Sequence, residues 1–429
     1  MKNNSHNAQD SVCPSFGCTE NCSVAQLTLT NFRNYEFLRL DANPTPVVLT
    51  GPNGSGKTNI LEAISYLSPG RGMRSSKLSD IKRQIPNIAN DVLDDYSPFG
   101  FATATSWAVS AEVKKADDNL SIATGVESAF KDFNGINNRN YEKRISKLNN
   151  EKLTNQSELS RYITTVWLTP DMDRLFKGPV QPRRRFLDRL VFAFDNEHAK
   201  IVSNYEHSLK EWSLILKSGK IDNNWLLTLE ENIASFGVAI AASRRNLVSK
   251  LNRFIEKEND DIFPNVILKL DGIIEDMLDK MPAIEVEDKF KSLLLKQRRN
   301  VTYNEAVDGT HRTDLKVFHQ SKKMPAELCS TGEQKALLIS VVLAHAKSLA
   351  MTKGFSPILL LDEIIAHLDD KKREALLSKI LELNIQAWMT GTDIESFNSL
   401  KGKAQFFHIE NAKIKKLDMW ILFNCKGSK

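Results

Sequence analysis

An eight-residue segment rich in glycine places the strongest constraint on how this chain can fold. It satisfies the pattern G-x-x-x-x-G-K-[ST] at every position, with Gly51, Pro52, Asn53, Gly54, Ser55, Gly56, Lys57 and Thr58. The short apolar run 47–49 precedes it, and residues 59–67 follow with helical periodicity. A strand, a glycine loop and a helix in this order surround a phosphate with backbone N–H groups and the positive end of the helix. The segment therefore predicts an α/β fold with a phosphate-binding loop (P-loop).

The side chains that close this loop predict its ligand. Lys57 is expected to reach the β and γ phosphates of ATP, and the Thr58 hydroxyl is expected to ligate Mg²⁺. Asn59 completes the residues that we expect to contact the nucleotide on this side. A glycine turn with a chance lysine is the alternative, but the flanking strand and helix favour the nucleotide site.

A pair of acidic residues forms the second motif. The continuous apolar run 358–361 is typical of a strand buried on both faces of a parallel sheet, and it ends in Asp362 and Glu363. In a P-loop protein, Asp362 would hold Mg²⁺ directly or through water, and Glu363 could act as the general base that polarises the attacking water. Two acids after an apolar strand also occur by chance, but the P-loop earlier in the chain favours the functional interpretation.

The third motif predicts an oligomeric state. Ser330, Thr331, Gly332 and Gln334 belong to the sequence S-T-G-E-Q, which precedes a long apolar-faced helix and resembles the ABC signature S-x-G-x-Q. A hydroxyl and backbone N–H groups at a helix N-terminus form an anion site. In ABC-type ATPases this site completes the ATP pocket of the other subunit, so the motif predicts an ATP-dependent homodimer. The alternative is an ordinary helix start, with Ser330 and Glu333 forming a capping box.

Length and composition predict a globular protein of two lobes. A chain of 429 residues exceeds the usual size of a single core, and its 41% hydrophobic and 26% charged residues are ordinary. Five cysteines are too few for a disulfide framework, and no stretch reaches the roughly 18 apolar residues of a membrane span. We therefore expect a cytoplasmic protein without a membrane partner. The net charge of +5 is compatible with a polyanionic partner but does not identify one.

The order of the motifs predicts a head that is split by an insertion. Residues 1–22 are expected to form a disordered polar tail, and 23–190 the first half of the head, with the P-loop and a peripheral β lobe. Helical periodicity predicts a helical lobe over 191–323, and 324–429 returns to α/β sequence with the signature and the acidic pair. In the tail, His6, Cys13, Cys18 and Cys22 could together ligate zinc, although their spacing matches no known finger.

Several stretches resemble one family, the RecF proteins, within the wider group that includes SMC-type ATPases. They are 31–35 with Arg33, the extended P-loop 56–64, 168–171 followed by Gly178 and 183–188, the signature 330–338, and 359–369. The resemblance covers the chain from Val24 onward. It implies an ABC-type P-loop ATPase head, a mixed sheet with flanking helices, into which a mainly helical second lobe is inserted. Arg33 is counted among the expected nucleotide-binding residues.

The resemblance also implies a role in recombinational DNA repair. RecF-like proteins are expected to dimerise on DNA with ATP, to hydrolyse it slowly, and to cooperate with RecR and RecO in loading a recombinase at gaps. Two alternatives stay open: an ABC transporter-type ATPase subunit, and a DNA clamp that uses ATP without hydrolysing it. Weak DNA-stimulated ATPase activity is the expectation if Glu363 is a base.

Three features depart from the pattern or stay unassigned. Where transporter ATPases place a switch histidine, this chain has Thr390-Gly391-Thr392-Asp393, and only Gln181 lies in a plausible region for the Q-loop glutamine. DNA contact requires only correctly placed Lys and Arg, and the candidates are Arg71, Arg74, Arg183, Arg184 and Arg185. The alternative for these arginines is a solvated surface, and an arginine within 183–185 could instead pair with Asp188 or lie near the nucleotide.

Overall fold

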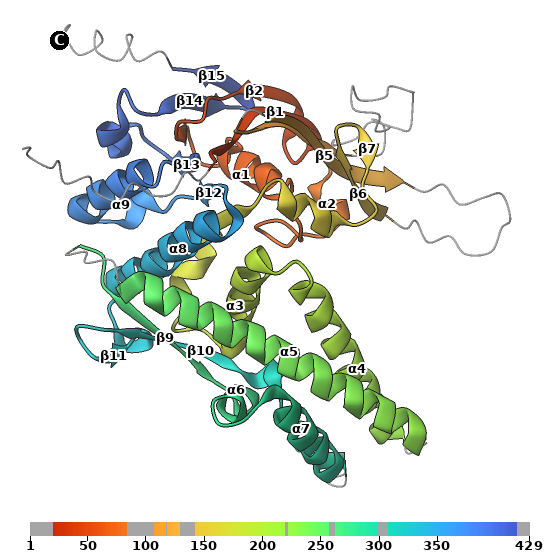
Figure 1. Ribbon diagram of the computed structural model, residues 1–429. Helices are drawn as coiled ribbons and strands as arrows, with labels where there is room; N and C mark the ends of the chain where they lie inside the picture. Colours follow the sequence, from red (N-terminus) through yellow and green to blue (C-terminus); the bar gives the residue numbers. More distant parts are fainter. Residues whose placement is uncertain are drawn as a thin grey trace, which may run out of the picture.

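The chain folds into an α/β head and a lobe dominated by helices, with helix α8 between them (Figure 1). The computed structural model describes residues 20–83, 107–116, 118–128, 142–218, 222–256, 262–298 and 308–417. The head combines two sheets with flanking helices, which is the mixed α/β architecture expected of an ABC-type ATPase head.

The sheet that carries the nucleotide motifs has six strands, and five of them run parallel. Its order is β15 (Lys413–Lys416), β14 (Gln405–Glu410), β3 (Val47–Thr50), β13 (Ala387–Gly391), β12 (Ile358–Leu361) and β8 (Thr165–Leu168). The β12 strand lies between two parallel neighbours and all four of its residues are buried, which confirms the prediction from its apolar run. The carboxyl ends of β3, β12 and β13 meet at one edge, where the motifs lie.

The second six-stranded sheet is antiparallel. Its order is β2 (Tyr35–Asp41), β1 (Cys22–Phe32), β4 (Ala108–Lys115), β5 (Asp118–Ser128), β6 (Glu142–Leu148) and β7 (Glu151–Lys152). The P-loop helix α1 (Lys57–Ser65) contributes Ile60, Leu61 and Ile64 to a core shared with strands of both sheets. The short helix α2 (Leu78–Ile81) follows in the same region.

The second lobe contains five helices and a small sheet among its described residues. The helices are α3 (Val180–Phe194), α4 (His198–Ser218), α5 (Asn223–Glu256), α6 (Ile273–Leu278) and α7 (Ala283–Arg298). The sheet has the order β11 (Met324–Pro325), β10 (Asp314–His319), β9 (Val266–Asp271), which periodicity had not indicated. The boundary expected between residues 190 and 191 falls inside α3, whose Phe186 and Leu190 belong to the core that also contains β12.

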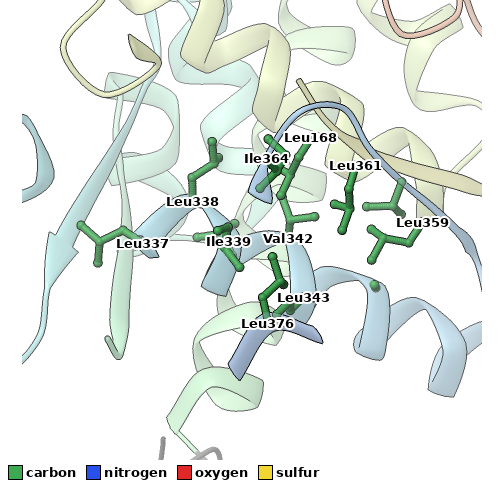
Figure 2. Packing of buried hydrophobic residues seen from close by; sticks show 14 of the residues in the cluster. Leu168, Leu337, Leu338, Ile339, Val342, Leu343, Leu359, Leu361, Ile364 and Leu376 are labelled. Atoms are coloured by element: carbon green, nitrogen blue, oxygen red, sulfur yellow. The ribbon is translucent and has the colours of Figure 1, made fainter. Parts of the chain in front are cut away.

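Helix α8 (Thr331–Lys353) connects the two parts of the molecule. Figure 2 shows Leu338, Val342 and Leu343 of this helix packed with Leu361 of β12 and Leu376 of α9 (Asp370–Glu382). Among the described helices, α8 has the length and composition that could cross a membrane, and 78% of its most apolar window is buried in the fold. That burial is typical of a core helix.

The amino end of the described chain begins inside the fold. Cys22, which the tail was expected to include, is the first residue of β1 and is 1% exposed. Its backbone N–H donates to Ser356 Oγ, and its Sγ donates to the carbonyl oxygen of Tyr162. Burial raises the pKa of the Cys22 thiol to about 12. This environment opposes the zinc role considered for Cys22, and the three other expected ligands lie outside the described residues.

Candidate nucleotide-binding site

The P-loop passes from the end of β3 to the start of α1, and glycine is required at two of its positions. Gly51 has φ 147°, and a Cβ there would lie 2.1 Å from the carbonyl oxygen of Ile409. Gly56 has φ 112°, and a Cβ would lie 2.6 Å from both Asn34 Nδ2 and the Tyr35 hydroxyl. At Gly54, by contrast, no described atom lies within 4 Å of such a Cβ. The loop is therefore closely packed at its ends and open in the middle, as a phosphate cradle requires.

Lys57 lies on the inner side of this loop. It is 3% exposed, and its Nζ donates to the carbonyl oxygens of Gly51 at 2.8 Å and Pro52 at 2.9 Å. Burial lowers the pKa of the Lys57 ammonium, while the carboxylates of Glu363 and Asp362 act in the opposite direction. The lysine is thus placed beside the P-loop backbone and within the field of the acidic pair.

Three residues from distant parts of the sequence meet at the carboxyl edge of the parallel sheet. Thr58 Oγ1 donates to Asp362 Oδ1 at 2.8 Å, and Thr390 Oγ1 donates to the same oxygen at 2.9 Å. The backbone N–H of Glu363 donates to Thr390 Oγ1 at 2.8 Å. The two residues predicted as Mg²⁺ ligands therefore lie in direct contact, and Thr390 connects both members of the acidic pair.

The carboxylate of Asp362 is buried, with 5% of the residue exposed. Burial raises its pKa, and the hydrogen bonds from Thr58 and Thr390 oppose that shift. A carboxylate and a hydroxyl side by side are oxygen ligands of the kind that Mg²⁺ prefers. The residues present therefore fit the metal expected here.

Glu363 has an unusual backbone conformation. Its φ is 51°, in the left-handed region that non-glycine residues seldom adopt, and the residue is partly exposed. The bond from its N–H to Thr390 holds it there. Such strain concentrates at functional sites, where the surrounding structure over-determines it.

Thr390 contacts both members of the acidic pair, which sequence reasoning did not predict. It is 1% exposed and lies in β13, which follows the acidic pair in the chain. One signal in the sequence could have indicated this residue: it lies in the stretch where transporter ATPases place a switch histidine. A threonine in an apolar strand is otherwise an ordinary β-sheet residue.

Arg33 lies against α1, with its guanidinium bonded to protein groups. Its Nε and Nη2 donate to the two carboxylate oxygens of Glu62 at 2.9 and 2.6 Å, and Nη1 donates to the Asp80 carbonyl. Glu62 is fully buried and also contacts Arg74. In this structure Arg33 therefore supports the P-loop helix, and nucleotide contact by Arg33 stays a prediction.

A chain of amide hydrogen bonds extends from Arg74 to the P-loop. Arg74 Nη1 donates to Asn59 Oδ1 at 3.2 Å, Asn59 Nδ2 donates to Asn34 Oδ1 at 2.7 Å, and Asn34 Nδ2 donates to the Ser55 carbonyl at 3.2 Å. Arg74 also affects the pKa of Asp362, lowering it against the effect of burial. Arg74, considered first for DNA contact, thus lies beside the nucleotide motifs.

The signature lies at the exposed amino end of α8. Ser330 is the N-cap: its Oγ accepts from the Glu333 N–H, and Glu333 Oε2 accepts from the Ser330 N–H at 2.8 Å. The capping box considered as an alternative is therefore present. It leaves Ser330 and Thr331 exposed, and no described atom lies within 4 Å of a Cβ at Gly332. Both the N–H and the hydroxyl of Ser330 donate to Glu333 Oε2, so an anion that binds at this helix start stays a prediction.

Gln334 differs from its neighbours in the signature. It is 1% exposed, and its Nε2 donates to the Cys329 carbonyl at 2.8 Å. Its side chain therefore fixes the turn before α8 instead of facing solvent. Nearby, hydrogen bonds from Lys322 and Ser330 lower the pKa of Glu333 to about 2, so the capping carboxylate is ionised at neutral pH.

The three consecutive arginines 183–185, considered for DNA contact, differ in their exposure to solvent. Arg183 is buried and forms a two-point ion pair with Asp314, at 2.7 and 2.9 Å, so the DNA role considered for it is wrong. Arg184 is half-buried, whereas Arg185 and Gln181 are exposed on α3. Asp188 is bonded instead to Arg244, with two bonds of 2.8 Å, and to His198 at 2.9 Å.

Comparison with known proteins identifies the family. The family model described as RecF/RecN/SMC N terminal domain matches residues 23–415. The chain is 40% identical over 393 residues to the DNA replication and repair protein RecF of Mesorhizobium japonicum, covering 91% of this chain and 97% of that protein. It is also 40% identical over 398 residues to the protein of that name from Agrobacterium fabrum, with 92% and 99% covered.

Solved structures share the fold. One described as the recombination mediator protein RecF-ATPrS in the RecFOR pathway superposes with a TM-score of 0.75 at 22% identity, covering 94% of this chain and all of that one. Another, described as RecF-ATP in the same pathway, has a TM-score of 0.71 at 23% identity, covering 93% of this chain and all of that one. Sequence identity to the curated proteins along nearly the whole chain decides the family: the chain belongs to the RecF family of DNA replication and repair proteins.

Proposed function

We propose that this protein is a cytoplasmic, ATP-dependent DNA-binding protein of recombinational repair. It binds ATP with Mg²⁺, dimerises on DNA, and hydrolyses ATP slowly while helping to load a recombinase at gaps. The observation that carries the proposal is the convergence of Thr58, Asp362 and Thr390 beside the P-loop. Family membership supports the DNA role and the RecR and RecO partners, and it disfavours the transporter alternative.

Each residue at the carboxyl edge of the parallel sheet has a separate role in the proposed reaction. The open P-loop backbone and Lys57 bind the phosphates, and Thr58 and Asp362 would hold Mg²⁺. When bound, Mg²⁺ neutralises charge that develops on the β and γ phosphates. Glu363 orients the attacking water and accepts its proton, while Thr390 fixes the Glu363 backbone. The strained backbone of Glu363 favours hydrolysis over a clamp that never turns over ATP.

The signature would act on a second copy of the chain. Ser330 and Thr331 stand exposed at the amino end of α8, and the positive end of the helix favours an anion there. A γ-phosphate held by the P-loop of another subunit would supply that anion. ATP would then join two subunits because each nucleotide contacts both.

The assembly can be tested by sedimentation of the purified protein with Mg²⁺-ATP, with and without gapped duplex DNA. The wild type should shift from monomer to dimer with ATP, and DNA should lower the protein concentration at which dimers form. Lys57→Ala should stay monomeric under all conditions. A wild type that is monomeric throughout, or dimeric regardless of ATP, would contradict the proposal.

A further inference from the structure

A basic cavity lies beside the nucleotide site but apart from its motifs. Its volume is about 460 Å³, and it is lined by Gly70, Arg71 and residues 75–79 together with Tyr66, Arg144 and Gln156. The segment 70–83 carries five basic residues, at positions 71, 74, 77, 82 and 83, against the single acidic residue Asp80. The cavity is therefore bordered by a strongly basic stretch of chain.

No acidic side chain is among the described residues that line this cavity. Arg71 and Lys77 are exposed at the surface, and neither takes part in an ion pair among the described residues. Ser75 is also exposed, with φ 51° in the left-handed region. The side chains of Arg71, Lys77 and Ser75 therefore lie at the mouth of the cavity, where a ligand from solvent can reach them.

The third cation of the cavity is buried. Arg144 is 8% exposed, and its guanidinium donates to Thr124 Oγ1 and to the carbonyl oxygens of Tyr66, Ser68 and Gly70. Within the described chain, none of these partners is a carboxylate. Burial lowers the pKa of Arg144 to about 10, so it is still charged at neutral pH. An anion in the cavity would compensate this charge in a medium of low polarity.

A tyrosine hydroxyl adds a second observation. The Tyr66 hydroxyl is buried and has no hydrogen-bond partner among the described atoms, and Tyr66 lines the cavity. An unsatisfied buried hydroxyl is costly, and its presence calls for a partner such as a ligand oxygen. Arginine, lysine and hydroxyl donors together match the oxygens of a phosphate.

We infer that this cavity binds a backbone phosphate of DNA. The inference rests on the proposed function, which supplies the polymer. Arg71, Lys77 and Ser75 hold the phosphate at the surface, and the charge of the buried Arg144 stabilises it from below. The same loop carries Arg74, whose bonds lead through Asn59 and Asn34 to the P-loop, so DNA here lies one loop from the nucleotide.

The test compares paired variants of the full-length protein. Arg71→Gln with Lys77→Gln removes two charges at the cavity, and Lys415→Gln with Lys416→Gln removes two from the exposed strand β15 as a matched control. DNA affinity is measured by fluorescence anisotropy of a labelled duplex over a range of salt concentrations. The cavity pair should weaken binding about tenfold and reduce the slope of log affinity against log salt by about 0.9, the contribution of one phosphate.

The control pair should keep the wild-type slope, and both pairs should bind labelled ATP as the wild type does. If the cavity pair keeps the wild-type slope and affinity, the assignment of this cavity is wrong while DNA binding stands. If the wild type itself shows no salt-dependent affinity for DNA, the proposed function fails as well. Inorganic phosphate is the second probe, and its effect on thermal stability is measured for the wild type and the cavity pair. If phosphate stabilises only the wild type while both proteins bind DNA equally well, the cavity is a free-phosphate site. That result would overturn the inference.

Discussion

Thr58 Oγ1 donates a hydrogen bond of 2.8 Å to Asp362 Oδ1, across 304 residues of sequence. The bond joins the end of the P-loop to the end of β12, so the two expected Mg²⁺ ligands are held together by the fold of the sheet. Thr58 and Asp362 would hold Mg²⁺ through a hydroxyl and a carboxylate oxygen, the ligand types that this ion prefers. The site is in this sense pre-organised.

Thr58→Val should therefore remove the effect of Mg²⁺ on nucleotide affinity. Valine has nearly the shape of threonine but offers no oxygen, and the loss of a bond to a charged group corresponds to about 10- to 100-fold in affinity. Titration with labelled ATP, with and without Mg²⁺, measures the effect. Thr58→Ser should retain most of the Mg²⁺ dependence, and an undiminished dependence in Thr58→Val would contradict the assignment.

Thr390→Val should slow ATP hydrolysis by about 10- to 100-fold, the usual effect of removing a group that orients a catalytic residue. It should change KM for ATP little, because Thr390 contacts Asp362 and the Glu363 backbone and not the P-loop. Thr390→Ser should restore activity. Thr392→Val is the neighbouring control, since Thr392 is exposed and bonds Asp393. A change confined to KM would show that Thr390 serves binding alone.

The parts of the site that are local in sequence were predictable, and those that depend on distant pairing were not. The P-loop and the acidic pair each occupy a few consecutive residues, so the pattern alone placed the P-loop between the correct strand and helix and the acidic pair after the correct strand. Thr390 was not predictable because its role depends on Asp362, 28 residues earlier, arriving at the same sheet edge. The position of Thr390 in the stretch where transporter ATPases place a switch histidine was a signal for the site, but it did not indicate the bond to Asp362.

The same reason explains the error over Arg183. Three consecutive arginines suggest a basic surface, but Arg183 pairs with Asp314, 131 residues later, in the second lobe. Helical periodicity indicates which face of α3 is buried, and Arg183 lies on that face beside Phe186 and Leu190. That the carboxylate of Asp314 accepts the hydrogen bonds of Arg183 could be found only from the fold.

Stability should fall in mildly acidic solution because of His345. This histidine lies in α8 and is 1% exposed; its Nε2–H donates to the Leu190 carbonyl, and burial lowers its pKa to about 3. The unfolded chain binds a proton near pH 6.5 and the folded chain does not, so stability is lost as the pH falls from 6.5 towards 3.

His345→Gln keeps a donor for Leu190 but cannot be protonated. Urea unfolding at pH 7 and pH 5 should therefore show a smaller loss of stability in this variant than in the wild type. Equal losses in the two proteins would show that His345 is not kept neutral by burial.

Ser330→Arg should bind ATP as a monomer but fail to dimerise with it. An arginine at the N-cap removes the hydroxyl and fills the space that a partner's γ-phosphate would occupy, while the P-loop is untouched. Glu363→Gln should behave in the opposite way, because slower hydrolysis leaves the closed dimer intact. Light scattering with Mg²⁺-ATP distinguishes the two, and ATP-dependent dimers of Ser330→Arg would contradict the role of the signature.

The central claim, that one ATP is shared between two subunits, is tested most directly by mixing Ser330→Arg with Lys57→Ala. In the heterodimer, the P-loop of the first variant faces the intact signature of the second, and the other pocket lacks both. Each variant alone should be inactive, and the ATPase rate of the mixture should return in part. If both variants are folded and no mixture recovers any activity, the shared pocket is contradicted.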